Sequence, residues 1–383
     1  MDAVHGERGE HDVVQRQDGR FGSAHGLALI LLGGAIVFAP AATRLFGFTG
    51  FVAVYAAATL LWLPVMRRSL PLAFVLLIAV ALRLPFFFQE PLLSGDVYRY
   101  LSDGAVFAKG GNPYVYTPTD PRINHPEIRS IYPPHAQFLF RVAHELRLWR
   151  FVLLLADIAV IVLLRHRGLA YATCPLVIVE GVWNGHVDLI AGAFLVVALL
   201  YRSGIATGMA VGLKISPVAA VPQLITRRNA VAFLATLLVP FVPFLGGPIM
   251  PGLRDYATRW IFNSPLYSAT RALLELIPTK EIWTHHPLRF ELISDFVYRH
   301  LYADFLTRGV LAIIAVAAIL LARRVTTAVT ALLLCSPAIH PWYWLAIIGT
   351  SLLERSPLLF FALAAPASYL LYDDVSPLLV FAI

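Results

Sequence analysis

Two carboxylates stand close together in the polar segment that follows the first apolar stretches of the chain. Asp96 and Asp103 are seven residues apart, which is two helical turns, so both share one face if 96–108 is helical. A positioned carboxylate can accept or deliver a proton in catalysis. Arg99 follows Asp96 by three residues, a spacing that favours a local ion pair. The segment therefore predicts either an acid–base site or a solvated interfacial helix with an ordinary salt bridge.

A second polar group interrupts two apolar stretches at "EGVWNGHVD", residues 180–188. It holds the polar side chains Glu180, Asn184, His186 and Asp188. Ionisable residues at membrane depth are expensive and usually face an interior cavity. These residues therefore favour a functional site, although Asn184-Gly185 is also typical of a simple turn, with His186 as its cap.

Several cations and a histidine lie elsewhere in apolar or aromatic surroundings. Lys214 in "GLKISP" suits an anion such as a phosphate, or it snorkels to a membrane interface. His340, in "AIHPWYW", lies in a cluster that is also typical of an interfacial aromatic belt. Three arginines of a long polar loop either bind phosphate or solvate that loop: Arg254, Arg259 and Arg271.

Metal binding is left open by the spacing of these side chains. His186 and Asp188 alone are too few ligands, too closely spaced, for a zinc site. Asp96, Asp103, His186 and Asp188 could assemble a divalent site only in three dimensions. We therefore predict no cofactor and assign no metal ligand, with a divalent metal as the alternative.

The composition defines the class of protein. The 383 residues are 58% hydrophobic and only 14% charged, whereas soluble chains carry about 25% charged residues. We predict an all-α polytopic membrane protein. The net charge of +7 does not indicate nucleic acid, because basic residues also collect at membrane ends. Cys174 and Cys335 lie in apolar stretches and are expected to be buried thiols.

Apolar segments of about 17–25 residues can cross a bilayer as helices. With an ambiguous 204–225, the sequence predicts about 11–13 transmembrane or re-entrant helices. The candidates are 25–42, 49–66, 70–88, 148–164, 169–183, 188–201, 228–246, 305–322, 325–339, 342–353 and 357–372.

Short basic turns indicate the orientation of these spans, since Lys and Arg favour the cytoplasmic side. This places the N-terminus inside, with 1–24 as a flexible cytoplasmic tail before a single transmembrane domain, 25–383. Two long loops, about 89–147 and 247–304, then face the outside of the inner or plasma membrane. For all the short basic turns to lie on the cytoplasmic side, 204–225 must enter and leave the membrane on that side as a re-entrant or broken helix. Such irregular backbone is tolerated where protein or a water-filled cavity covers it.

A series of motifs resembles a known family. "GDVYRYLSDGAVFAKGGNPYVYTP", "INHPEIRSIYPP", "NGHVD", "GLKISP", "WIFNSPLYS" and "SPAIHPWYW" follow in this order. Together they are similar to bacterial polyprenyl-phosphate-dependent glycosyltransferases of the GT-C superfamily, in particular the mannosyltransferase-like branch. The likeness spans roughly residues 70–350, with departures at Ser102 and His135.

The resemblance implies transfer of a hexose, with mannose expected, from a polyprenyl-phosphate donor to a glycan, glycolipid or protein acceptor on the outer face. Asp96 matches the family's general base, and one base opposite a phosphate leaving group implies inversion. We assign Asp103 to orienting the site. Residues expected to bind the donor or substrate are Tyr98, Arg99, Asn184, His186, Asp188, Lys214, Arg259, Asn263 and His340.

Two other classes remain as alternatives. A transporter or flippase for a lipid-linked or small solute would also show an intramembrane Lys214 and a broken 204–225 segment. A transporter, however, should place polar groups near the midplane, and no internal repeat is evident. A non-catalytic membrane scaffold would not need the carboxylates around Asp96.

Overall fold

The computed structural model describes residues 22–276 and 295–373, so residues 1–21 of the expected tail 1–24 and part of the loop 247–304 lie outside it. These described ranges are helical and contain no strand, apart from one isolated parallel bridge between Phe262 and Ala338. The prediction of an all-α membrane protein is confirmed. Cys174 is buried, Cys335 is half-buried, and neither is in a disulfide.

The first two expected spans form the element α2 (Ser23–Val65). Phe46 and Gly47 interrupt it with non-helical backbone angles, in the gap expected between 25–42 and 49–66. α3 (Leu72–Arg83) and the 3-10 turn η2 (Leu84–Phe88) follow. The next elements are α4 (Asp96–Ala108), α5 (Pro134–Val142), α6 (Leu146–Leu164), η3 (Arg165–Arg167), α7 (Gly168–Ala172), η4 (Val177–Trp183), α8 (Asp188–Tyr201) and α9 (Gly204–Leu213).

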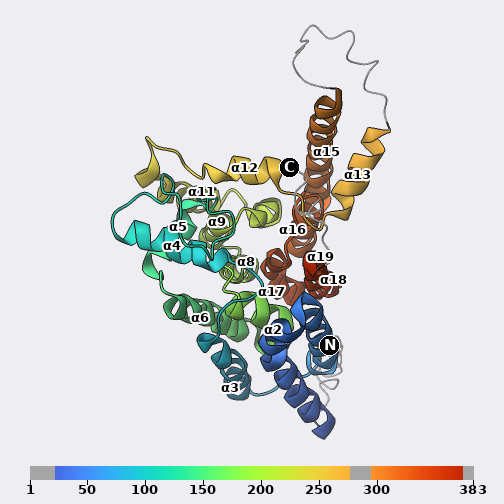
Figure 1. Cartoon of the computed structure of the whole chain (residues 1–383). Coiled ribbons are helices and arrows are strands. Elements are labelled where there is room, and N and C mark those ends of the chain that lie inside the picture. Colours follow the sequence, from blue (N-terminus) through green and yellow to red (C-terminus); the bar gives the residue numbers. More distant parts are fainter. Residues whose placement is uncertain (1–21, 277–294, 374–383) are drawn as a thin grey trace, which may run out of the picture.

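The second half of the chain is built from shorter pieces. They are η5 (Ser216–Ala220), α10 (Val221–Leu224), α11 (Ala230–Leu238), η6 (Val239–Phe244), α12 (Gly252–Arg259), α13 (Pro265–Glu275), α15 (Asp295–Leu321), α16 (Val325–Leu334), η7 (Pro341–Trp344), α17 (Leu345–Glu354), α18 (Leu358–Ala364), η8 (Ala365–Tyr369) and α19 (Leu370–Asp373). In Figure 1, α15 and α13 lie side by side and α12 runs across toward α4 and α5.

Within the described residues, α2 and the Ala303–Leu321 part of α15 are long and apolar enough to cross a membrane. The pair η4 and α8, bent by 118°, adds a third candidate if it counts as one span. Other expected spans appear as shorter apolar helices that continue as 3-10 turns at Pro85, Pro240 or Pro366. Proline removes a backbone donor, so the α-helical ladder ends there.

A buried ion pair fixes the helices beneath the polar segments. Arg83 at the end of α3 donates to Asp157 of α6, and both side chains are fully buried. The same guanidinium donates to the Ala172 carbonyl of α7, 2.5 Å away. Because a buried charge is tolerated only when paired and hydrogen-bonded, this contact fixes α3, α6 and α7 relative to one another.

The outward faces of several helices carry large exposed apolar side chains. Ile313 and Leu321 of α15 are 72% and 82% exposed, and Val231 of α11 is 77% exposed. Extended apolar surfaces of this kind mark contact with lipid or with a partner. Together with the apolar helices, they agree with a membrane environment.

Candidate active site

Asp96 is the first residue of α4, which covers the range 96–108 considered as a helix from the sequence. Its side chain is half-buried. The Tyr132 hydroxyl, contributed by the segment before α5, donates to Asp96 Oδ2 over 3.2 Å. The backbone N–H of Asp96 donates to the Ser94 hydroxyl. The carboxylate is therefore held in place and still partly accessible.

The surroundings of Asp96 alter its acidity in opposing directions. Burial raises the pKa of Asp96 above its ordinary value, because a desolvated carboxylate is disfavoured. Lys214, Arg99 and the Tyr132 hydroxyl favour the charged form and offset part of this rise. The net result is a carboxylate that is a better proton acceptor than an exposed aspartate.

Arg99 does not form the ion pair with Asp96 that the spacing favours. Its guanidinium instead donates to the carbonyls of Asn124, His125 and Ile128, at 2.8–3.1 Å. The three carbonyls lie in one short loop segment and together engage both terminal nitrogens of the guanidinium. Arg99 therefore holds the 124–128 loop against α4. Among the described residues, no salt bridge forms between Asp96 and Arg99.

Asp103 shares the Asp96 face of α4 but faces protein. It is 1% exposed, and Gln137 of α5 donates to its Oδ2 over 3.3 Å. Burial raises the pKa of Asp103 to about 6, while Ser130, Arg99 and Gln137 lower it. Asp103 thus joins α4 to α5 and orients the helix that carries Asp96.

The pKa of Asp103 predicts a pH-dependent stability. Between about pH 4 and 6 the folded protein keeps a proton that the unfolded chain has released, so the free energy of unfolding falls as pH rises. The full loss is on the order of 3 kcal/mol. Asp103→Asn should remove this dependence, so thermal unfolding in detergent at pH 4.5 and pH 8 should differ less than in the unmodified protein. The exposed Glu145→Gln should keep the dependence, and an unchanged pH slope in Asp103→Asn would contradict the assignment.

The second polar group lies at a break between two helices. η4 and α8 meet at 118° across residues 184–187. Gly185 has φ +79°, and a Cβ there would lie 2.9 Å from Val97, so only glycine fits this corner easily. Asn184 accepts from the Leu93 N–H and donates to the Val179 carbonyl. The Asn184 side chain therefore joins the break to the segment before α4.

Lys214 stands at a second helix break, where α9 ends and the backbone becomes extended. This confirms that 204–225 is a broken helix. Lys214 Nζ donates to Asp188 Oδ2 at the start of α8, 3.1 Å away. It also lies 5.4 Å from the ring centre of Tyr132 and 4.6 Å from that of Tyr343. Two breaks and the Asp96 helix thus meet around Tyr132.

His186 and His340 are joined by a stack of rings. Trp342 lies between them, 4.2 Å from His186 and 4.4 Å from His340, with interplanar angles of 7°. Phe262 stacks on the other face of His340 at 4.7 Å. His186 Nε2 also lies 3.4 Å from Glu180 Oε2, and Tyr369 donates to Glu180 Oε1. This stack brings the two histidines to one region, although they are far apart in the chain.

Three other expected binding residues have no described contact with Asp96 or Lys214, although Asn263 lies next to the ring stack. Arg259 has a side chain that is 71% exposed and pairs with Asp255 one helical turn earlier. Asn263 has φ +48° and donates weakly to the Ile339 carbonyl, 3.4 Å away. Tyr98 donates to Glu90 on the other side of α4. No described contact joins these three to Asp96.

The remaining loop arginines also lack a contact with the cluster in the described residues. Arg254 is exposed on α12. Arg271 pairs with Glu275 of its own helix and with Asp304 of α15. The Arg271–Asp304 pair joins α13 to α15.

The divalent site that four dispersed residues could have formed is not assembled. In the described part of the chain no group of three or more His, Cys, Asp and Glu side chains could hold a metal ion. Asp103 faces α5, and Asp188 is engaged by Lys214.

Sequence reasoning missed the tyrosines of the cluster. Tyr132 connects Asp96 to Lys214, and Tyr343 packs beneath Lys214 and contacts the Tyr256 hydroxyl of α12. Both residues occur in motifs that carry the family resemblance, "IYPP" and "HPWYW". Tyrosine is common at membrane interfaces, so its residue type alone gave no signal of a role.

The all-α membrane fold thus brings a partly desolvated carboxylate, Asp96, and a lysine, Lys214, to the same tyrosine, Tyr132. Residues 23–131, from α2 to the residue before Tyr132, match the family model described as alpha-(1->6)-mannopyranosyltransferase, N-terminal domain. This match confirms the resemblance to GT-C-type mannosyltransferases over that segment and supports a glycosyltransferase that transfers mannose. No curated protein and no solved structure matches the chain.

Proposed function

We propose that the protein transfers a mannosyl residue from a polyprenyl-phosphate donor to an acceptor at the outer membrane face, with inversion. The observation that carries this proposal is the position of Tyr132. Its hydroxyl bonds to Asp96, and its ring lies under the Lys214 ammonium. A proton acceptor and a cation therefore border the same tyrosine.

The reaction follows from the chemistry of these two groups. The acceptor hydroxyl attacks the anomeric carbon while Asp96 takes its proton. The bond between that carbon and the phosphate oxygen breaks, and the electron pair leaves with the polyprenyl phosphate. A single displacement inverts the anomeric carbon.

Lys214 stabilises the charge that grows on the leaving phosphate. Its ammonium has three donors, and the Asp188 contact uses one of them. The side chain is 14% exposed, so a phosphate can approach it. Asp188 holds the ammonium in position before the donor binds.

The membrane fold agrees with the proposed donor. A polyprenyl tail stays in lipid while its sugar meets a polar acceptor at the surface. Exposed apolar side chains on α11 and α15 supply a lipid-facing surface, and the polar segments around α4 supply the acceptor side. The donor, the membrane lipid and an acceptor glycan, glycolipid or protein are thus the expected partners.

The test is a donor panel with purified protein. Polyprenyl-phosphate mannose should release polyprenyl phosphate and mannosylate a mannoside acceptor, and NMR of the product should show an inverted anomeric centre. Other polyprenyl-phosphate sugars and nucleotide-linked mannose serve as comparisons. Turnover with nucleotide-linked mannose alone, or retention at the anomeric carbon, would refute the proposed donor or mechanism.

Sidedness gives an independent prediction. Thr119 in the α4–α5 loop and Arg227 in the turn before α11 are both exposed. In a background with Cys335→Ser, Thr119→Cys should react with an impermeant thiol reagent added to intact cells. Arg227→Cys should react only after permeabilisation. The reverse pattern would place the site on the cytoplasmic side.

A further inference from the structure

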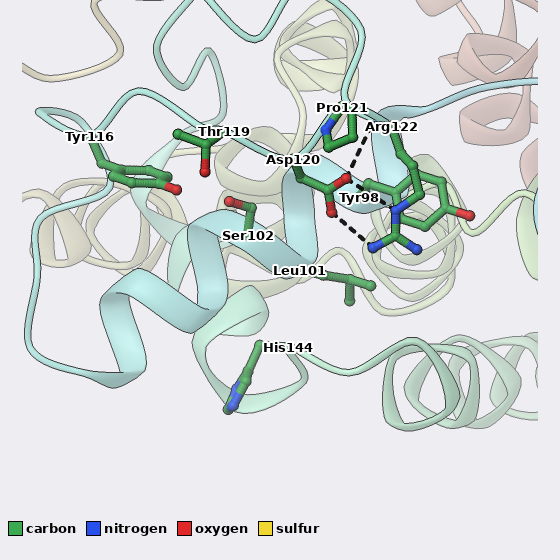
Figure 2. A pocket seen from close by; sticks show the side chains of 9 residues that line it. All are labelled: Tyr98, Leu101, Ser102, Tyr116, Thr119, Asp120, Pro121, Arg122 and His144. Carbon is green, nitrogen blue, oxygen red and sulfur yellow. Dashed lines mark hydrogen bonds and ion pairs between the residues drawn. The ribbon is translucent and has the colours of Figure 1, made fainter.

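A pocket of about 610 Å³ lies between α4 and the α4–α5 loop. Its volume is in the range of about 300–1,000 Å³ that is typical of small-molecule sites. The α4–α5 loop contributes Tyr116, Thr119, Asp120 and Arg122, and α4 contributes Tyr98 and Ser102. In Figure 2 the hydroxyls of Tyr116 and Ser102 point toward one another, with Thr119 nearby.

The pocket is distinct from the candidate active site and adjacent to it. Tyr98 and Ser102 lie on one face of α4, whereas Asp96 lies about half a helical turn round, on the opposite face. The two regions meet at Gly95, where a Cβ would lie 2.5 Å from the Arg122 carbonyl. The loop that lines the pocket therefore packs directly on the residue before Asp96.

The lining suits an uncharged, hydroxyl-rich ligand. Arg122 donates to both oxygens of Asp120, at 3.1 and 2.8 Å, and these bonds lower the pKa of Asp120 and keep it ionised. The two charges cancel, so the pocket offers little attraction for a phosphate or a carboxylate. The paired groups and the nearby hydroxyls can still donate and accept hydrogen bonds at fixed positions.

The aromatic part of the pocket is held in place. Arg122 lies over the Tyr98 ring, 4.1 Å from its centre, and the Tyr98 hydroxyl donates to Glu90. Tyr116 is half-buried and lines the pocket without a described side-chain hydrogen bond. A pyranose combines an apolar C–H face with a rim of hydroxyls, which fits an aromatic side chain beside placed polar groups.

We infer that this pocket binds the part of the acceptor glycan that lies away from the reacting end. The inference rests on the proposed function. With distal mannose units on Tyr116, Thr119 and the Asp120–Arg122 pair, the reacting end of the acceptor extends around the start of α4 to Asp96. The pocket then selects acceptors by length and takes no part in chemistry.

The test compares a single mannoside with a mannose hexasaccharide as acceptors. The unmodified protein should show the lower KM for the hexasaccharide. Tyr116→Ala should raise that KM about tenfold, the loss of about 1.4 kcal/mol of binding, and leave kcat and the KM for the single mannoside unchanged. Thr119→Val, at an exposed position, should act in the same direction. Val115→Ala, exposed in the same loop but outside the pocket lining, is the matched control.

Binding separates this inference from the proposed reaction. Calorimetry with Asp96→Asn protein should detect the hexasaccharide whether or not transfer occurs, and Tyr116→Ala in that background should weaken binding. Equal KM values for both acceptors in the unmodified protein, or an equal effect of Tyr116→Ala on both, would overturn the subsite. Hexasaccharide binding without any mannosyl transfer would instead refute the proposed function alone.

Discussion

Asp96→Asn should reduce turnover by at least about 10²-fold, the lower end of what a positioned base contributes. Asparagine keeps the size of the side chain but accepts no proton at neutral pH. The Tyr132 hydroxyl can still donate to the amide oxygen, so the variant should fold and bind the lipid donor almost normally. Turnover per folded molecule and donor affinity, measured in one preparation, give the two quantities needed.

Two further variants sharpen the assignment of the base. Tyr132→Phe removes a hydrogen bond that lowers the pKa of Asp96, so its kcat/KM should reach a plateau at higher pH than in the unmodified protein. Asp255→Asn, on the exposed surface of α12, is the matched carboxylate control. Turnover of Asp96→Asn at the unmodified rate would exclude Asp96 as the base and make Glu180 or Asp188 the next candidate.

Lys214→Ala should lower the stability of the protein and also its affinity for the lipid donor. Asp188 is fully buried and bonded to Lys214. Removing one partner of a buried pair leaves an uncompensated charge, at a cost of about 3–5 kcal/mol. Thermal unfolding in detergent should therefore begin at a clearly lower temperature. A variant with unchanged stability would contradict the pairing seen in the structure.

The double variant Asp188→Asn, Lys214→Ala separates stability from donor binding. It removes both charges, so stability should largely return. Donor affinity should remain about tenfold to hundredfold lower, because one charge-assisted hydrogen bond contributes about 1.5–3 kcal/mol. Arg227→Ala, which removes an exposed cation in the turn before α11, is the matched control. Normal donor affinity in the double variant would restrict Lys214 to a structural role.

Much of the fold follows from local composition. The apolar stretches became helices, the helix over 96–108 begins at Asp96, and 204–225 is broken at Lys214. These features depend on neighbouring residues, because apolar length and proline act over a few turns. The lengths of the helices were harder to predict. A proline ends the α-helix, but the apolar stretch of sequence continues beyond it, so the apolar stretch is longer than the α-helix.

The candidate site depended on contacts that spacing does not encode. The i,i+3 rule favoured Asp96 with Arg99, yet Arg99 binds loop carbonyls 25–29 residues away. Asp96 is bonded instead to Tyr132, 36 residues later. The i,i+3 rule considers only partners on the same helix. A loop that packs against the helix offers further hydrogen-bond acceptors, and these bind Arg99.

The sequence by itself determined the class of the protein, its helical segments and the polar residues that interrupt them. Only the tertiary structure decided which of those residues meet. Lys214 has no acidic neighbour in sequence, and Asp188 reaches it from 26 residues away because two helices break at the same place. Buried charges must find partners where the fold places them. Their pairing is therefore determined by how the broken helices pack, and it cannot be predicted from residue spacing along the chain.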